Sequence, residues 1–375
     1  MRLTLRTVMI RVALPLLAIM PLQLTAAESA PIMPLASRSL LLDITLAAER
    51  IVVAGERGHI LYSDDNGSTW QQANVPTTQM LTGIHFVDAQ RGWAAGHDGL
   101  ILASSDGGEN WRIQRDGIAA QHQANLELRE RSLQKIEQLK QQLETNDEET
   151  LADLELELED AVMDLEDADL ALEELVFTSP FMDIWFQDSN RGWAVGAFGT
   201  LVTTTDGGQH WNSEQQLVDN PDEFHLNTIT GDGKGRVFIA GEGGVMFRSL
   251  DSGVTWETIA PFYDGSWFGT VYDARRDVLL AFGLRGNLFR STDFGANWDP
   301  LLNDNHLTLA GGTSGPEGEI VLVGGVGTVL RSSDGGESFQ RTMIEDRLSL
   351  SSGMSRKGQL ILIGQGGAKT RKDAE

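Results

Sequence analysis

The chain has 375 residues, of which 41 are glycine and none is cysteine, and its 54 acidic and 29 basic side chains give a formal net charge of −25. Without cysteine there is no disulfide framework, no thiolate metal site, no cysteine nucleophile and no attachment point for a lipoprotein acyl chain. A charge this negative argues against direct binding to nucleic acid or to an anionic lipid surface, because phosphate binding requires clustered Lys and Arg. We therefore expect a protein partner or a cationic one.

The N-terminal residues have the layout of a secretory signal peptide. Three arginines precede an apolar run, Val12–Leu24, and Thr25-Ala26-Ala27 supplies small residues for cleavage after residue 27. The alternative is a membrane anchor, but the run is shorter than the ~20 residues that span a bilayer. Cleavage removes three basic and no acidic groups, so the mature chain would carry −25 − 3 = −28. We expect an exported protein, periplasmic in a cell with an outer membrane, that does not insert into the membrane after cleavage.

A box with the pattern Ser/Thr-x-Asp-x-Gly-x-x-Trp/Phe occurs six times, and its aspartates are Asp65, Asp106, Asp206, Asp251, Asp293 and Asp334. Successive aromatic positions lie 41, 100, 45, 42 and 41 residues apart, and the interval of 100 is one period plus an insertion. A period near 40 with strand-like flanks is typical of four-stranded propeller blades. We interpret the boxes as structural turns, in which Asp and Ser bind backbone amides and Gly supplies a positive φ. A calcium or sugar site at each box is the functional alternative.

The repeats predict an all-β fold, a seven-bladed β-propeller. Six units carry boxes, and a seventh runs from about Arg347 to Arg371, where Gly364–Gly367 repeats the Gly-x-x-Gly turns of earlier units. This last unit ends before its fourth strand. Because a circular array does not leave that edge open, we expect Ile32–Leu40 to supply the missing strand and close the ring.

Residues 119–176 contain neither glycine nor proline and predict an antiparallel α-helical hairpin inserted into the propeller. The predicted organisation is therefore a signal peptide (1–27), the closing strand with blades 1 and 2 (28–118), the hairpin (119–176) and blades 3 to 7 (177–375). The apolar positions expected in the helix–helix seam are Leu126, Leu133, Ile136, Leu139 and Leu143, followed by Leu151, Leu154, Leu158, Val162, Leu165, Ala168, Leu172 and Leu175.

The predicted hairpin is strongly acidic. Its 18 acidic and four basic groups give a net −14, and no Lys or Arg occurs from Gln141 to Asn190. Like charges on one helix repel each other, and a basic partner would relieve that repulsion. The partner-binding candidates on this basis are Glu155, Glu159, Glu166 and Glu173. A solvated acidic face without a partner is the alternative.

One pattern resembles a known family. The run Asp-x-x-Arg-Gly-Trp-Ala-x-Gly, present at Asp88–Gly96 and Asp188–Gly196, is followed by a strand and an Asp box. This combination resembles the Ycf48/Hcf136-type photosystem II stability and assembly factors, and the resemblance covers Leu41 to about Arg371 apart from the hairpin. It implies a secreted or lumenal seven-bladed propeller that holds a membrane subunit during assembly and does no catalysis.

The resemblance also implies arginines on the propeller surface. Here one repeat position, seven residues after the first Gly of Gly-x-x-Gly, holds Arg248, Arg290, Arg331 and Arg371. The same position holds Tyr62, Ala103 and Thr203 in the first three blades. Four guanidiniums could recognise an anion or a carboxylate. The alternative is that each pairs with an Asp or Glu of the adjacent blade.

Similar propellers in non-photosynthetic proteobacteria accompany transporters of the resistance-nodulation-division type, including mycobacterial-large-membrane-protein-like ones. We therefore predict an accessory or assembly factor for such an exporter, with a photosystem II assembly factor as the alternative. A sialidase-like glycoside hydrolase is the alternative from another class, because sialidases share Asp boxes and use a tyrosine nucleophile. Only Tyr62, Tyr263 and Tyr272 are present, and the seven histidines lack zinc-ligand spacing. We expect no catalytic residue, cofactor or metal.

Overall fold

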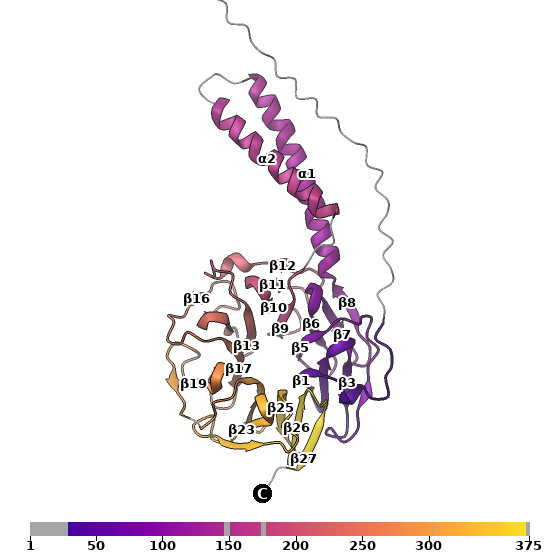
Figure 1. The fold of residues 1–375 in the computed structure, drawn as a ribbon, viewed down its shortest axis with the longest axis vertical. Helices are drawn as coiled ribbons and strands as arrows, with labels where there is room; N and C mark the ends of the chain where they lie inside the picture. Colours follow the sequence, from indigo (N-terminus) through magenta and orange to yellow (C-terminus); the bar gives the residue numbers. More distant parts are fainter. Residues whose placement is uncertain (1–28, 146–150, 174–177, 303, 373–375) are drawn as a thin grey trace, which may run out of the picture.

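The computed structural model describes residues 29–145, 151–173, 178–302 and 304–372. The predicted signal peptide and its cleavage site lie outside these residues. The described chain forms seven antiparallel sheets arranged in a ring, and a pair of helices extends from one side of it (Figure 1). The predicted seven-bladed propeller with an inserted helical hairpin is confirmed.

Each sheet is one blade, and its strands run in chain order from the centre of the ring outward. The strands are, in blade 1, β1 (Leu41–Ala47), β2 (Arg50–Gly55), β3 (Ile60–Ser63) and β4 (Gln71–Gln72); in blade 2, β5 (Leu81–Phe86), β6 (Gly92–Gly96), β7 (Ile101–Ser104) and β8 (Arg112–Arg115); in blade 3, β9 (Phe181–Phe186), β10 (Gly192–Gly196), β11 (Leu201–Thr204) and β12 (Asn212–Ser213); in blade 4, β13 (Leu226–Gly231), β14 (Val237–Gly241), β15 (Met246–Ser249) and β16 (Glu257–Thr258); in blade 5, β17 (Trp267–Asp273), β18 (Val278–Gly283), β19 (Leu288–Ser291) and β20 (Asp299–Pro300); in blade 6, β21 (Leu309–Ser314), β22 (Ile320–Gly324), β23 (Thr328–Ser332) and β24 (Gln340–Met343); and in blade 7, β25 (Leu350–Arg356), β26 (Gln359–Gly364) and β27 (Lys369–Lys372).

The second and third strands of a blade are joined by the same short turn in the first six blades. These turns are the 3-10 segments η2 (Glu56–Gly58), η3 (His97–Gly99), η4 (Ala197–Gly199), η6 (Glu242–Gly244), η7 (Leu284–Gly286) and η8 (Gly325–Gly327). The middle residue of each turn has a positive φ, which reaches 61° at Gly243 and 55° at Val326. Glycine suits this conformation, whereas a β-branched valine is strained in it.

The hydrophobic core lies between neighbouring blades. In one cluster Leu280 and Phe282 of blade 5 pack with Leu322 of blade 6, and all three side chains are fully buried. The second strand of each blade has a blade on both sides, which explains its nearly continuous run of apolar residues, as in Val278–Gly283. The interface between adjacent blades is therefore the unit that stabilises the fold.

The predicted closing strand is wrong. Within the described residues, Ile32–Leu40 forms no strand but the 3-10 turn η1 (Ala36–Arg38), and the sheet of blade 7 has three strands. Pro31 and Pro34 lack the N–H groups that a strand alongside β27 would donate. The segment instead crosses the end of blade 7, where the Ala368 N–H donates to the Ser37 carbonyl over 2.9 Å.

Blades 7 and 1 are joined by side chains. The Arg356 guanidinium, only 4% exposed, donates to the backbone carbonyl and to the carboxylate of Glu49, both over 2.6 Å. The Asn66 amide donates to the Arg356 carbonyl, and the Thr370 hydroxyl donates to the Gly67 carbonyl. The open edge of β27 is charged, with Lys369 and Lys372 among its residues. A charged edge strand resists pairing with a foreign strand, so blade 7 tolerates its missing fourth strand.

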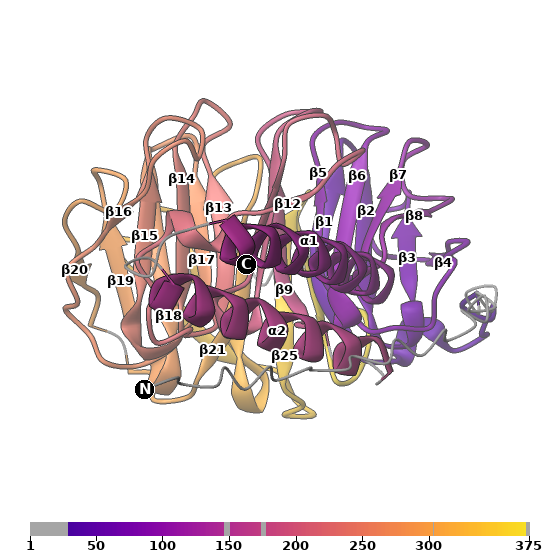
Figure 2. The same cartoon turned by 90° about the horizontal axis from the view of Figure 1, so that it is seen from above.

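The two helices are α1 (Gly117–Thr145) and α2 (Leu151–Glu173), and they pack side by side in antiparallel directions (Figure 2). Ile136 and Leu139 of α1 and Ala161 of α2 are buried in their seam, as predicted for the first two. Leu154, Leu158 and Leu165 of α2 pack against this seam, also as predicted, and the predicted Ala168 is buried. The prediction is wrong at three positions. Leu126, Leu133 and Val162 are partly exposed, and Asn125, Ser132 and Ala161 lie buried in their place.

None of the helices in the described part of the chain is long and apolar enough to cross a membrane.

The junction of blades 7 and 1 leads to a stability prediction. Arg356→Ala removes two charge-assisted hydrogen bonds and leaves the Glu49 carbonyl without this donor, so we expect the free energy of unfolding to fall by about 1–3 kcal/mol. Urea denaturation followed by tryptophan fluorescence measures the change. Arg112→Ala, at an exposed position on β8, is the matched control. Equal stability of the two variants would show that the junction does not depend on Arg356.

Candidate functional site

The six Asp boxes use their polar groups within their own turns. In the first box the Ser63 hydroxyl donates to Asp65 Oδ1 over 2.8 Å and accepts from the Gly67 N–H over 2.8 Å. The Thr69 N–H and hydroxyl donate to the two oxygens of the same carboxylate. The other five boxes repeat these bonds around Asp106, Asp206, Asp251, Asp293 and Asp334.

These bonds stabilise the ionised form of the box aspartates. The hydrogen bonds from Thr69 and Ser63 lower the pKa of Asp65 to about 2, and the bonds from His210 and Thr204 lower the pKa of Asp206 to about 2. The described residues contain no group of three or more His, Asp or Glu side chains arranged to hold a metal ion. The geometry of the boxes therefore supports a structural role.

The four arginines of the shared repeat position lie on the third strands of four successive blades, and most of them are already paired. Arg248 contacts Glu257 over 2.6 Å, and Arg331 contacts Glu319 over 2.6 Å. Arg290 donates to the Gly335 carbonyl over 3.0 Å and lies 3.7 Å from Glu337, both in blade 6. Arg371 is exposed on β27. The structure thus distributes these guanidiniums around the ring and does not gather them into one site.

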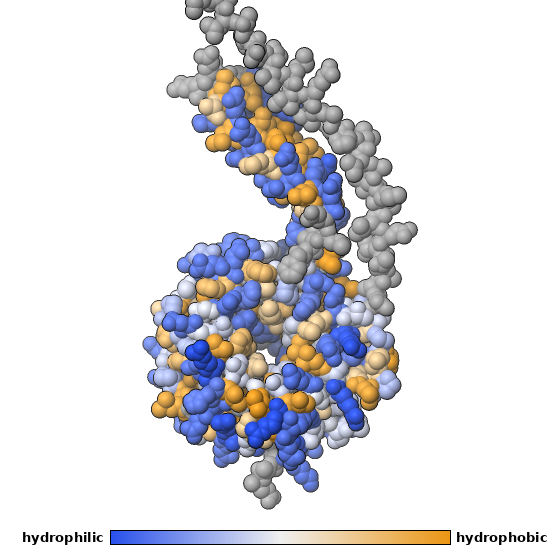
Figure 3. All heavy atoms as spheres, viewed as in Figure 1, coloured by the Kyte–Doolittle hydropathy of each residue, from blue (hydrophilic) through white to orange (hydrophobic). Residues whose placement is uncertain are grey.

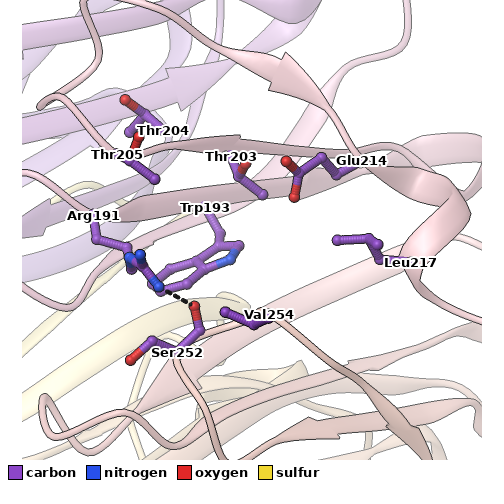
Figure 4. Close-up of a pocket in the computed structure, with 10 residues that line it drawn as sticks. Arg191, Trp193, Thr203, Thr204, Thr205, Glu214, Leu217, Ser252 and Val254 are labelled. Carbon is purple, nitrogen blue, oxygen red and sulfur yellow. Dashed lines mark hydrogen bonds between the residues drawn. The ribbon is translucent and has the colours of Figure 1, made fainter.

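In blade 3 the repeat position that holds arginine in the later blades lines a pocket, which was not predicted from the sequence. In blade 3 the position holds Thr203, which pairs across the sheet with Trp193, whereas Arg248 of blade 4 pairs with Phe238. The short threonine leaves a cavity of about 340 Å³ between β11 and the Asp-box turn of blade 4 (Figure 4). The sequence does not single out this pocket, because blade 2 has the same large–small pair in Trp93 and Ala103.

The pocket presents hydrogen-bonding and apolar groups together. Trp193 is 2% exposed and forms one wall of the pocket. Arg191 donates to the Ser252 carbonyl over 2.8 Å at one end, and Glu214 and Leu217 line the other end (Figure 4). Glu214 can accept a hydrogen bond, and Leu217 can contact an apolar group at the same end.

Two carboxyls that sequence analysis also missed lie on the innermost strands. Asp43 accepts from the Ile84 N–H of blade 2, and Asp183 accepts from the Ile229 N–H of blade 4, each over 2.9 Å. Burial raises the pKa of Asp43 to about 6. Burial and then the negative charge of Asp43 raise the pKa of Asp183 to about 7. Asp183 is the lone polar residue in strand β9, which was the available signal, whereas Asp43 shares β1 with Thr45.

The acidic candidates of the hairpin lie on one helix. Glu155, Glu159, Glu166 and Glu173 are exposed on α2, which carries no basic residue. An ion pair between Arg129 and Asp169, over 2.6 Å, links the helices. At 3.6 residues per turn the four glutamates fall on one side of α2, so the structure does bring them onto a common surface.

The tyrosines do not have the properties of a nucleophile. Burial and a hydrogen bond to Asp277 raise the pKa of Tyr272 to about 12, and burial also raises the pKa of Tyr263. A nucleophilic tyrosine requires a change in the opposite direction, toward the phenolate.

The family model described as "Photosynthesis system II assembly factor YCF48" matches residues 64–139 and 163–306, more than half of the chain. The chain belongs to the YCF48 family. The two matched segments lie on either side of the tip of the hairpin.

Two curated relatives of this YCF48-family chain are cyanobacterial. The photosystem II assembly lipoprotein Ycf48 of Synechococcus sp. (strain CC9902) is 27% identical over 192 residues, which are 49% of this chain and 56% of the relative. The photosystem II assembly protein Ycf48 of Thermosynechococcus vestitus is 28% identical over 201 residues, which are 52% of this chain and 56% of the relative. The chain thus matches a little over half the length of these relatives.

Solved structures agree on the fold. A structure described as YCF48 bound to D1 peptide has a TM-score of 0.59 at 17% identity and covers 97% of this chain and 100% of its own. YCF48 from Cyanidioschyzon merolae has a TM-score of 0.57 at 14% identity, with 92% and 98% of the two chains covered. The WD40 propeller domain of Doa1 has a TM-score of 0.54 at 11% identity and covers 92% and 95%.

The raised pKa of Asp183 predicts a pH dependence in this YCF48-family chain. A carboxyl whose pKa is higher in the folded than in the unfolded state contributes stability at low pH that is lost as the pH rises from about 4 through about 7. Asp183→Asn carries no charge, so relative to wild type it should gain about 1–3 kcal/mol in unfolding free energy between pH 5 and pH 8. We expect the lower end of this range, because the carboxyl is partly accessible to water.

Denaturation at several pH values measures this difference. Buried His85, whose pKa burial lowers to about 4, opposes the trend in each protein but cancels in the comparison. Asp222→Asn, on an exposed loop, is the control. A pH-independent difference between Asp183→Asn and wild type would contradict the prediction.

The paired arginines generate a second prediction. Replacing Arg248, Arg290 and Arg331 by Ala together removes contacts within and between blades, and we expect unfolding to become easier by about 1–3 kcal/mol. Arg371→Ala should leave stability nearly unchanged. Differential scanning calorimetry measures both changes. Undiminished stability in the triple variant would make these arginines available for a partner instead.

Proposed function

We propose that this chain is a non-catalytic, exported propeller that binds a membrane protein while the complex of that protein is assembled. The observation that carries the proposal is the family match across both halves of the propeller, in a family described as assembly factors. A related propeller is described as bound to a D1 peptide. We infer that this chain likewise recognises a segment of a membrane protein on the exported side of the membrane.

The curated relatives indicate which membrane protein this chain binds, and we call that protein the client. Both curated relatives are photosystem II assembly proteins, and they favour a photosystem II subunit over the transporter of the resistance-nodulation-division type that we predicted from the sequence. One curated relative is described as a lipoprotein, whereas the chain of 375 residues has no cysteine to carry a lipid. If this protein is held at a membrane, contacts with its client are the proposed means.

The hairpin is the proposed second contact. It lies away from the ring, and its two helices pack on each other through their own apolar seam, so the propeller does not need it for its core (Figures 1 and 2). An acidic arm of this kind is suited to a basic surface, because long-range attraction accelerates association.

Deletion of the hairpin tests its contribution to client binding separately from that of the propeller. A variant in which a short Gly/Ser linker replaces residues 119–176 should fold with cooperative unfolding and β-rich circular dichroism, yet capture less of the client. The assay incubates tagged protein with detergent-solubilised membranes of the source cell and identifies captured membrane proteins by mass spectrometry. A captured photosystem II subunit supports the favoured client, and a captured transporter supports the original prediction.

Two results would count against the proposal. Capture by the deletion variant at the wild-type level would remove the hairpin from the interface. Failure of the full chain to enrich any membrane protein over a tagged, unrelated propeller would overturn the assembly-factor function.

A further inference from the structure

Helix α2 has apolar side chains on two opposite faces. One face, with Leu154, Leu158 and Leu165, packs against α1. The other face carries Leu156, Met163 and Leu170, which are 60%, 60% and 56% exposed. We call these three residues the α2 stripe. Figure 3 shows apolar side chains along the hairpin surface between hydrophilic ones.

The spacing of the α2 stripe is that of a helix–helix seam. Its members are seven residues apart, and seven residues turn a helix through two turns less about 20°, so they align over a length of about 21 Å. An apolar seam with this period is what a second helix packs against in a coiled coil. Met163 adds an adaptable side chain at the centre.

Both edges of the α2 stripe are acidic. At 3.6 residues per turn, one edge holds Glu155, Glu159, Glu166 and Glu173, and the other holds Asp153, Glu157, Asp160, Asp164 and Asp167. Nine of the ten acidic residues of α2 therefore flank the stripe, and the helix contains no Lys or Arg. An apolar seam between two rows of carboxylates is complementary to a helix that carries an apolar seam between two rows of Lys or Arg.

We propose that the α2 stripe binds a basic amphipathic helix of the client, which would complete a three-helix bundle with α1 and α2. This inference rests on the proposed role of the hairpin as a contact arm and specifies its partner. A second copy of this chain is a poor occupant, because two α2 stripes in contact would bring carboxylates of both copies together. An anionic lipid surface is disfavoured by the same repulsion.

A synthetic helix tests the complementarity directly. The probe is a fluorescein-labelled peptide of four heptads with Leu at positions a and d and Lys or Arg at e and g. A second peptide has the same composition in scrambled order, so that it has the same charge but no apolar face. With the full chain we expect the amphipathic peptide to bind at least tenfold more tightly than the scrambled one by fluorescence anisotropy, and to gain helical circular dichroism.

Two variants separate the apolar and the charged contributions. Leu156→Gln/Met163→Gln/Leu170→Gln should weaken binding of the amphipathic peptide at least tenfold and abolish its preference over the scrambled peptide. Glu155→Gln/Glu159→Gln/Glu166→Gln/Glu173→Gln keeps the stripe and should flatten the salt dependence of binding. The matched control, Ile32→Gln/Leu250→Gln/Leu302→Gln, replaces three exposed apolar residues of the propeller and should bind like wild type.

Three outcomes would overturn the inference. The first is equal affinity for the two peptides, which would reduce the attraction to charge alone. The second is unchanged binding after the triple substitution in the α2 stripe. The third is self-association of the full chain by sedimentation that the triple substitution abolishes, which would make a second copy the occupant.

The membrane-capture assay distinguishes this inference from the proposed function. In one outcome, deletion of the hairpin abolishes capture of the client while the triple stripe variant retains it. That result supports the hairpin as a contact and refutes the α2 stripe as a helix-binding site. If both changes abolish capture, both stand. If neither change abolishes capture, both the hairpin and the α2 stripe are excluded as contacts, and the propeller is the remaining contact with the client.

Discussion

The propeller depends on how each blade meets the next, because the first and last blades share no strand. One contact recurs at these meetings: a side chain of one blade donates to the carbonyl at one position in the Asp-box turn of the following blade. The donor–acceptor pairs are Arg50 with Gly107, Gln114 with Gly207, Arg191 with Ser252 and Arg290 with Gly335. At the junction of the ring Thr370 donates to the Gly67 carbonyl, which lies one residue further along the corresponding turn, so the junction uses a related contact. The aspartate of each box holds the turn in shape, so the boxes stabilise the interfaces as well as their own hairpins.

Periodicity made the propeller predictable. Boxes that recur every 41 to 45 residues report both the number of blades and the positions of their turns, and the absence of glycine and proline from residues 119–176 marked the helices. The closing strand was not predictable by counting strands, because Pro31 and Pro34 remove backbone donors and side chains close the ring in its place. Two positions of the helical seam on α1 were misplaced for another reason. Buried Asn125 and Ser132 are polar, so a search for apolar residues selected the neighbouring leucines.

The interaction surfaces were less predictable than the fold, because they depend on what each side chain contacts. Arg248, Arg290 and Arg331 stood out in the sequence as a regular series, yet their partners Glu257, Glu337 and Glu319 are not periodic and could not be assigned beforehand. The pocket of blade 3 is lined by Trp193 and Thr203 of that blade and by the Asp-box turn of blade 4, so it depends on how the two blades meet. Asp43 and Asp183 meet only when the innermost strands converge, which no local pattern describes.

The absence of Lys and Arg from Gln141 to Asn190 also decides how this protein can be detected and handled. Trypsin cleaves after Lys and Arg, so digestion releases α2 within a single long, very acidic peptide that ends at Arg191. Peptides of that size and charge are poorly recovered in routine proteomics, and amine-reactive cross-linkers have no lysine to modify on α2. Contacts made by this helix would thus be missed by standard cross-linking mass spectrometry. Cleavage after Glu and carboxyl-directed cross-linking are the chemistries that its composition requires.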